Sequence, residues 1–259
     1  MLSAAIANEH RIRLKTSPTS HESISKLFRG FKLSQVSTHT RVPKLPLTDE
    51  HLRTLIDNLR RPEHGANSSR ASLVLWRTVW RVVMEYHTLG RFSDIARLTR
   101  KEIVFVTKPS RHLQVTFKDG KNDLFSEGGL RIVAANLEEP RYCPVELTAH
   151  YFMFLGTSHV GYLVPSCTPT NRPDPSKPLP YPGALADLRH LLDSLGFDSR
   201  MYGEHSGKRG AATQAAENGM SQTNLQRLGG WRSDTMAAKY VDMSTESKLK
   251  MSKMLQKRL

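Results

Sequence analysis

The chain has 259 residues, of which 38% are hydrophobic and 24% charged, so it can form one domain with an appendage or two small domains. No apolar run reaches the roughly 18 residues that a membrane span needs, and the N-terminal stretch lacks the pattern of a secretory signal. Two cysteines, Cys143 and Cys167, argue against a disulfide framework or a thiolate metal site. With 38 basic and 24 acidic residues the net charge is +14, which favours a polyanionic partner, nucleic acid above all. A ribosome-associated or anionic-membrane-binding protein is the alternative that charge leaves open.

The N-terminal segment, residues 1–43, differs from the rest of the chain. It carries seven Lys or Arg against two Glu, and one short helical pattern around residues 21–32. Pro43 and Pro46 then favour extended backbone, and Thr48 is a good helix N-cap. We therefore expect a boundary near Lys44, with the end of a domain and a linker before it, and a separate domain from 44 to 259.

The second segment predicts a mainly α (α+β) fold with a small antiparallel sheet. A short helix running into a strand is expected at 94–105, and strands joined by an Asp-Gly turn at 112–117 and 130–137. The proline-rich segment 166–183 is expected to be a loop. Helices are expected at 47–61, 69–90, 143–156, 184–196, 204–218, 221–230 and 233–242. The helix at 69–90 is apolar almost all round, so it should be buried.

The helix that opens at residue 204 has its cations at the unexpected end. His205, Lys208 and Arg209 crowd an N-terminus that the helix dipole already makes positive. Such an arrangement favours a bound anion, a phosphate in particular. Gly219 can end this helix and Ser221 can cap the next, giving a helix–turn–helix pattern that is also common in proteins that bind no DNA.

Motifs for other chemistries are absent from the sequence. It contains no H-E-x-x-H, no C-x-x-C, no G-x-x-x-x-G-K-[ST] and no G-x-S-x-G. We therefore expect no metal, no cofactor and no NTP-driven motor.

Five short sequence motifs are informative when they are taken together, in their order along the chain. They are Arg91 in "GRFSD", Lys118 in "FKDGK", His205 in "EHSGKR", Trp231 in "LGGWRSD" and Tyr240 in "AAKYVD". Singly, each has an ordinary explanation as a packing, capping or solvated residue. In this order and spacing, the chain resembles the tyrosine recombinase (phage integrase) family over nearly its whole length.

This resemblance implies an active site and a domain arrangement. Residues 6–34 look like the last part of the family's helical core-binding (SAM-like) domain, whose first helices would then be missing, and 44–259 like its catalytic domain. The implied site comprises the first arginine Arg91, its acidic support Asp94, the hairpin lysine Lys118 with Lys121 as competitor, the histidine His205, the His/Trp residue Trp231 and the nucleophile Tyr240.

One position departs from the family pattern. The second arginine should follow His205 by three residues, but Lys208 stands there, with Arg209 next to it. A guanidinium can bridge two phosphate oxygens, whereas an ammonium is a single compact charge. Three interpretations remain open: Lys208 substitutes with weaker transition-state binding, Arg209 reaches in, or catalysis is lost and DNA binding remains.

The resemblance implies site-specific recombination of double-stranded DNA, for a mobile element. Tyr240 would form a 3′-phosphotyrosyl intermediate without metal or cofactor. The resemblance also implies a homo-oligomer, a tetramer on DNA, in which the C-terminal tail at 246–259 joins the protomers. The expected location is the nucleus of a eukaryote or the cytoplasm and nucleoid of a prokaryote. The alternatives are a catalytically impaired, recombinase-derived DNA-binding protein, or an unrelated helix–turn–helix regulator, which would leave the contexts of Arg91, Lys118 and Tyr240 unexplained.

Overall fold

The chain divides into two compact units, Met1–Pro43 and Lys44–Leu259. The computed structural model describes residues 2–13, 17–36, 44–61, 70–117, 129–167, 173–203, 205–231, 233–241, 249 and 252–253. Within them, no helix is both long enough and apolar enough to cross a membrane.

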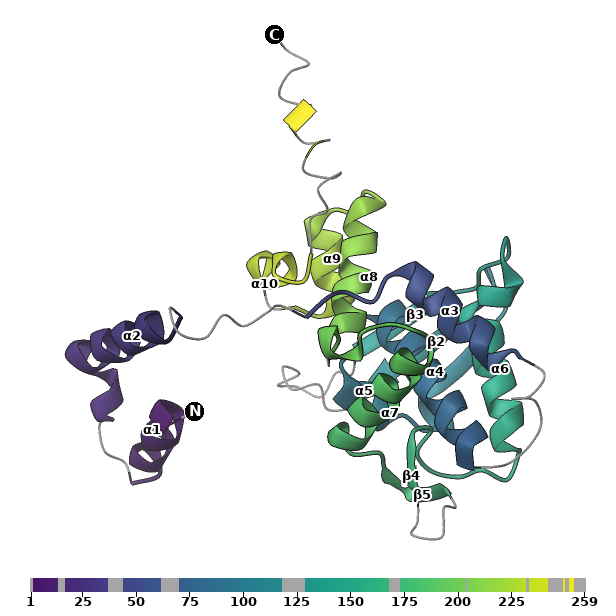
Figure 1. Ribbon diagram of the computed structural model, residues 1–259, viewed down its shortest axis with the longest axis horizontal. Coiled ribbons are helices and arrows are strands. Elements are labelled where there is room, and N and C mark those ends of the chain that lie inside the picture. Colours follow the sequence, from purple (N-terminus) through teal and green to yellow (C-terminus); the bar gives the residue numbers. More distant parts are fainter. Residues whose placement is uncertain are drawn as a thin grey trace. The chain divides into compact units, whose positions relative to one another are not determined.

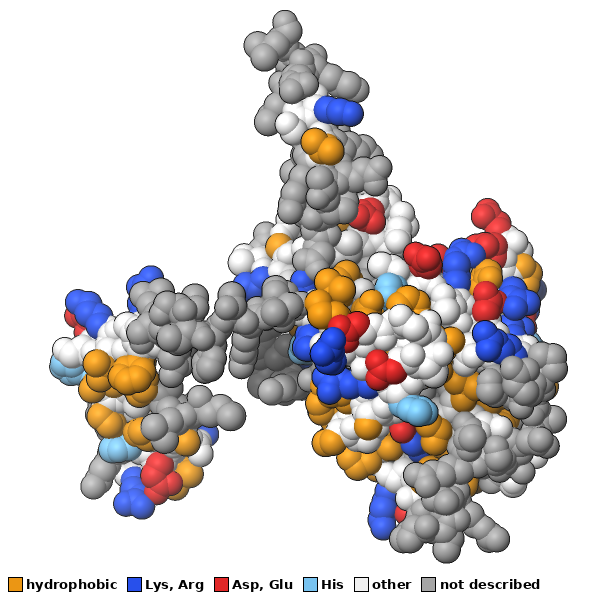
Figure 2. Space-filling model, in the orientation of Figure 1, with side chains coloured by type: hydrophobic (Ala, Val, Ile, Leu, Met, Phe, Trp, Pro, Cys, Tyr) orange, Lys and Arg blue, Asp and Glu red, His pale blue; other side chains and the backbone are white. Residues whose placement is uncertain are grey.

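The N-terminal unit contains two α-helices, α1 (Leu2–Ile12) and α2 (Glu22–Val36), joined through a 3-10 turn, η1 (Pro18–Ser20) (Figure 1). The expectation of one short helix here was wrong, because the alanine-rich start of the chain also forms a helix. Ile12, Leu27 and Phe31 are each more than half exposed. Figure 2 shows hydrophobic side chains gathered on the visible face of this unit, with basic ones at its rim.

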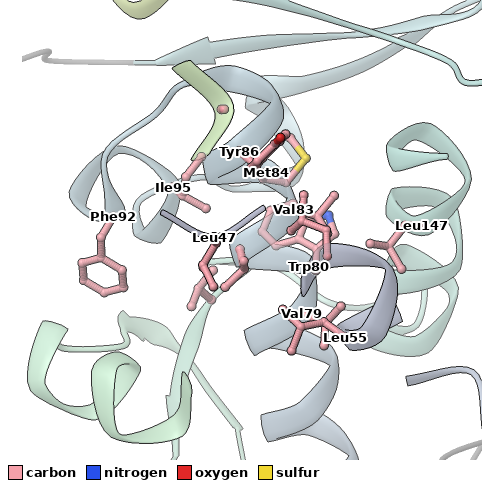
Figure 3. Close-up of a cluster of buried hydrophobic side chains, with 14 of the residues drawn as sticks. Leu47, Leu55, Val79, Trp80, Val83, Met84, Tyr86, Phe92, Ile95 and Leu147 are labelled. Carbon is pink, nitrogen blue, oxygen red and sulfur yellow. The ribbon is translucent and has the colours of Figure 1, made fainter. Parts of the chain in front are cut away.

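The second unit is built around α4 (Arg70–Thr88). It packs against α3 (Asp49–Leu59), α6 (Pro144–Leu155), α7 (Tyr181–Ser194) and α8 (Ser206–Glu217). Figure 3 shows side chains of α4, Trp80 among them, between Leu55 of α3 and Leu147 of α6. Trp80 is fully buried and its Nε1 donates to Thr148 Oγ1 at 3.1 Å. The burial predicted from the apolar pattern of this helix is confirmed.

Three antiparallel strands form the main sheet, in the order β1 (Ile103–Val106), β2 (His112–Phe117), β3 (Gly129–Ala134). The pairing places Val115 opposite Arg131 and Phe117 opposite Gly129. Leu113, Val115 and Val133 are buried on one face of the sheet, and β3 contacts α4 and α6. The small antiparallel sheet predicted from the sequence is therefore confirmed.

The expectation that the proline-rich segment is a loop was wrong in part. It forms a second, two-stranded antiparallel sheet of β4 (Pro165–Cys167) and β5 (Pro173–Pro178). A proline cannot donate a backbone hydrogen bond, but its carbonyl can accept one, and its fixed φ suits extended backbone. The carbonyl of Pro175 accepts from the backbone N–H of Tyr162 at 2.9 Å. Proline is therefore tolerated in this short edge ribbon.

Three further helices carry or adjoin residues of the site described below: α5 (Phe92–Ala96), α9 (Gln222–Gly229) and α10 (Asp234–Ala238). The described residues also include the 3-10 turns η3 (Arg100–Glu102), η4 (Pro140–Tyr142) and η5 (Ser199–Met201). Thr48 caps α3 and Ser221 caps α9, as predicted. Gly219, with a φ of +86°, follows the end of α8 and reverses the chain toward α9.

Candidate active site

Tyr240 lies just after α10, and three of the predicted site residues surround its ring. The Trp231 ring centroid is 5.0 Å from it, and the His205 ring meets it edge-on at 5.8 Å. The ammonium Nζ of Lys208 is 5.6 Å from the Tyr240 ring centroid and 4.3 Å from that of Trp231. The structure therefore brings together residues from the start of α8, the end of α9 and the end of α10.

Two local features produce this convergence. His205 is the N-cap of α8, and Lys208 lies three residues further on, so the two share one side of the helix. At the end of α9, Gly230 takes the left-handed conformation (φ +61°) and turns the chain back, so that Trp231 packs beside Gly229. Lys208 Nζ donates to the carbonyl of Gly229 at 3.0 Å, which ties the two helices together at the site.

Arg209, the other candidate at the start of α8, is directed elsewhere. Its Nη1 donates to the backbone carbonyl of Lys44 at 2.7 Å, on the segment that leads into α3. This direction agrees with the helix period, which turns the next position by about 100°.

Lys208 is the electrostatic centre of the site, with only 4% of its surface exposed. Its pKa is lowered to about 7, mainly because burial disfavours the charged form; the positive charges of Arg91 and Arg131 act in the same direction, and Asp94 opposes them. Lys208 on α8 thus interacts electrostatically with residues at the start of α5 and on β3. Three cations and one carboxylate thus share this region.

Arg91 and Asp94 form a compact turn at the start of α5. Arg91 is the N-cap, and the Oδ2 of Asp94 accepts a hydrogen bond from the Arg91 backbone N–H at 3.0 Å. The carboxylate therefore fixes the backbone that presents Arg91. A Cβ added to Gly90 would lie 3.1 Å from Cζ of Phe117, so the end of β2 is adjacent to this turn.

Lys118 and Lys121 lie outside the described residues. The strands that lead to them end at Phe117 and resume at Gly129.

Sequence reasoning missed Arg131 on β3. The neighbouring Leu130 and Ile132 are exposed, whereas Val133 is buried, so the strand alternation places Arg131 on the inward side. Its guanidinium Cζ is 5.9 Å from the Phe117 ring centroid, and burial lowers the pKa of the group while Asp94 opposes the shift. An arginine at an inward position of a half-buried strand was the available signal.

Comparison with known proteins places this geometry in a familiar fold. No protein-family model matches the sequence, and no curated protein matches it either. Among solved structures, XerH site-specific recombinase bound to palindromic difH substrate matches with a TM-score of 0.58 and 14% identity. The match covers 83% of this chain and 55% of XerH, so this chain spans little more than half the length of that protein.

Two further structures agree. The Tn1549 transposon integrase in complex with a circular intermediate DNA matches with a TM-score of 0.55 and 15% identity, over 98% of this chain and 76% of that one. A lambda integrase dimer bound to a COC′ core site matches with a TM-score of 0.51 and 16% identity, over 93% of this chain and 63% of that one. The fold is therefore that of the tyrosine recombinases and integrases, mainly helical with small antiparallel sheets.

Proposed function

We propose that this protein cleaves and rejoins DNA strands at specific sites through Tyr240. The observation that carries the proposal is the arrangement of His205, Trp231 and Lys208 around the Tyr240 ring, with Lys208 electrostatically coupled to Arg91. A phenol, an imidazole and clustered cations are the groups that transfer of a phosphoryl group to tyrosine requires.

In the proposed reaction, the phenolic oxygen of Tyr240 attacks a backbone phosphorus and the bond from phosphorus to the 5′-oxygen breaks. His205 assists removal of the phenolic proton, and the leaving 5′-oxygen takes a proton, for which Lys118 is the proposed donor. Arg91 and Lys208 bind the phosphate oxygens and neutralise the charge that builds in the transition state. Attack by the 5′-hydroxyl of another strand reverses the steps and releases Tyr240, so no external energy source is needed.

The proposal includes the assembly. Double-stranded DNA is the substrate, the N-terminal unit is a partial core-binding domain, and residues 246–259 link protomers in a tetramer acting for a mobile element. The XerH, Tn1549 and lambda structures are all complexes with DNA, and the lambda complex is a dimer. The exposed apolar and basic side chains of the N-terminal unit suit a surface that packs against a partner or a duplex.

A second candidate function is DNA binding without cleavage. Lys208 favours it, because its ammonium is hydrogen-bonded to Gly229 and its pKa is lowered to about 7. At neutral pH the free site then holds only part of the charge that a second arginine would supply.

Covalent trapping separates the two candidates. Duplexes selected from a random-sequence library by binding to the protein are rebuilt with nicks, so that a cleaved strand diffuses away. We expect DNA that remains attached to the protein through boiling detergent, and none with Tyr240→Phe. Binding without an adduct, even in Lys208→Arg, would support the binding-only function. An adduct in Lys208→Arg alone would mean that this lysine inactivates the enzyme.

A further inference from the structure

Arg131 reaches the site from a strand and not from one of the helices. A Cβ added to Gly230 would lie 2.7 Å from the Arg131 Nη2, so the guanidinium lies against the turn between Gly229 and Trp231. A Cβ added to Gly129 would lie 3.2 Å from the Arg131 Nη1. The side chain therefore extends from β3 past Gly129 toward the turn that positions Trp231 beside Tyr240.

Within the described residues, the guanidinium of Arg131 makes one side-chain hydrogen bond. Its Nη1 donates to the carbonyl of Leu130 at 3.1 Å, and its Nε is buried with no hydrogen-bond partner in the part of the chain that the structure describes. Partly buried guanidinium groups ordinarily meet a carboxylate or another anion, because a buried donor without a partner is energetically costly.

Among the described residues, positive charges outnumber negative ones around Arg131. Lys208 interacts electrostatically with Arg91, Arg131 and one carboxylate, Asp94, whose Oδ2 already accepts a hydrogen bond from the backbone N–H of Arg91. A bound anion would compensate the excess. Phosphate fits best, because a guanidinium offers two parallel donors to two of its oxygens.

We propose that Arg131 is a further phosphate-binding residue of this site, and that its planar guanidinium supplies the bidentate contact that Lys208 cannot make. The anion site itself rests on the geometry above. Its identification with the phosphate that Tyr240 attacks rests on the proposed function.

The cleavage test uses two nicked duplexes, one with the native phosphate at the cleaved position and one with a methylphosphonate, in which an uncharged methyl replaces one oxygen. With the native phosphate, Arg131→Gln is expected to form the tyrosyl adduct 10²- to 10³-fold more slowly, the range for losing one preorganised donor. With the methylphosphonate, the loss should shrink to a few fold, because there is less charge to neutralise.

Two other variants serve as controls. Arg131→Lys, which keeps the charge and the long side chain but not the fork, should lie between wild type and Arg131→Gln. Arg97→Gln removes an exposed arginine just after α5 and should keep the wild-type ratio of the two substrates. Equal losses of Arg131→Gln on both substrates would overturn the proposal, since they indicate a purely structural role.

Sulfate binding to the DNA-free protein tests the anion site without cleavage. The ¹³Cε signal of Lys208, followed by NMR during a sulfate titration, should shift saturably in wild type and Arg97→Gln, and need at least tenfold more sulfate in Arg131→Gln. If wild type shows no saturable shift, or Arg131→Gln matches it, the anion site is refuted. If sulfate binds as expected but wild type never forms an adduct, the strand-transfer function fails and the phosphate site stands.

Discussion

Lys208 holds an ammonium where the family pattern has a guanidinium, and 4% of its surface is exposed. In the part of the chain that the structure describes, the Lys208 ammonium donates to a neutral carbonyl, that of Gly229, and its neighbours Arg91 and Arg131 carry the same charge. Burial and repulsion both favour the neutral amine, so its pKa falls to about 7. A DNA phosphate would reverse the local balance and draw a proton back to this side chain.

If the proposed site binds a DNA phosphate, this proton uptake makes DNA binding pH-dependent. The pKa of Lys208 is about 7 in the free protein and is raised when phosphate binds, so between the two values the complex holds a proton that the free protein lacks. Below pH 7 both states are protonated and the group has no effect on affinity. From about pH 7.5 upward, Kd should rise by up to tenfold per pH unit, until the pKa of the complex is reached.

Fluorescence anisotropy with a selected duplex, at fixed salt between pH 7.5 and 9, measures this slope. Lys208→Arg keeps its charge throughout and should show a flatter profile. A wild-type Kd that does not change over this interval, or a slope that Lys208→Arg retains, would refute the linkage.

A helix or strand could be predicted from the sequence where the residues that determine it lie within or next to the element itself. The helix α4 follows from its apolar pattern, α3 and α9 from their N-caps, and β2 and β3 from the Asp-Gly turn signal between them. The β4–β5 ribbon did not follow, because its pairing depends on a partner strand and prolines suppress the strand signal.

The residues of the site could likewise be predicted only where nearby sequence identifies them. The order and contexts of His205, Trp231 and Tyr240 predicted residues that the structure brings together. Strand alternation could have shown that Arg131 faces inward, but not that it reaches the site, because that depends on the register of β3 with β2 and on the turn at Gly230, far away in the chain.

The segment before α3 crosses α8 at Gly210, and this contact supports the helix that carries His205 and Lys208. Leu47 donates its N–H to the carbonyl of Ser206 at 2.9 Å, and a Cβ at Gly210 would lie 1.6 Å from the carbonyl oxygen of Leu47. At Gly207, one turn earlier, an added Cβ would meet its nearest atom, Oε2 of Glu85, at an ordinary 3.7 Å.

Alanine at these two glycines should therefore have opposite effects. Gly210→Ala must displace backbone and is expected to lower the free energy of unfolding by about 3 kcal/mol or more. Gly207→Ala should be neutral or stabilise by up to about 1 kcal/mol, because alanine favours the helix. Urea unfolding followed by circular dichroism measures both. Similar values for the two variants would show that the crossing is looser than described.

The whole molecule carries a net charge of +14, and its basic residues occur in both units. Each phosphate contact releases bound counterions from DNA, so the logarithm of the binding constant falls with the logarithm of salt concentration, by about 0.9 per contact. If the N-terminal unit contributes to the DNA surface, removing one of its cations should change that slope, whereas a cation away from the DNA should leave it unchanged.

Arg29, exposed on α2, and Lys177, on β5, provide the comparison. Lys177 pairs with Asp174, and in Figure 1 the β4–β5 ribbon lies at the opposite end of its unit from α9. With a selected duplex between 50 and 300 mM salt, we expect Arg29→Ala to weaken binding and to reduce the slope by about one. Lys177→Ala should match wild type. If Arg29→Ala shows the wild-type slope, this position does not contact DNA and the core-binding role proposed for residues 1–43 loses its support. If both variants reduce the slope equally, the effect reflects overall charge and not a defined DNA surface.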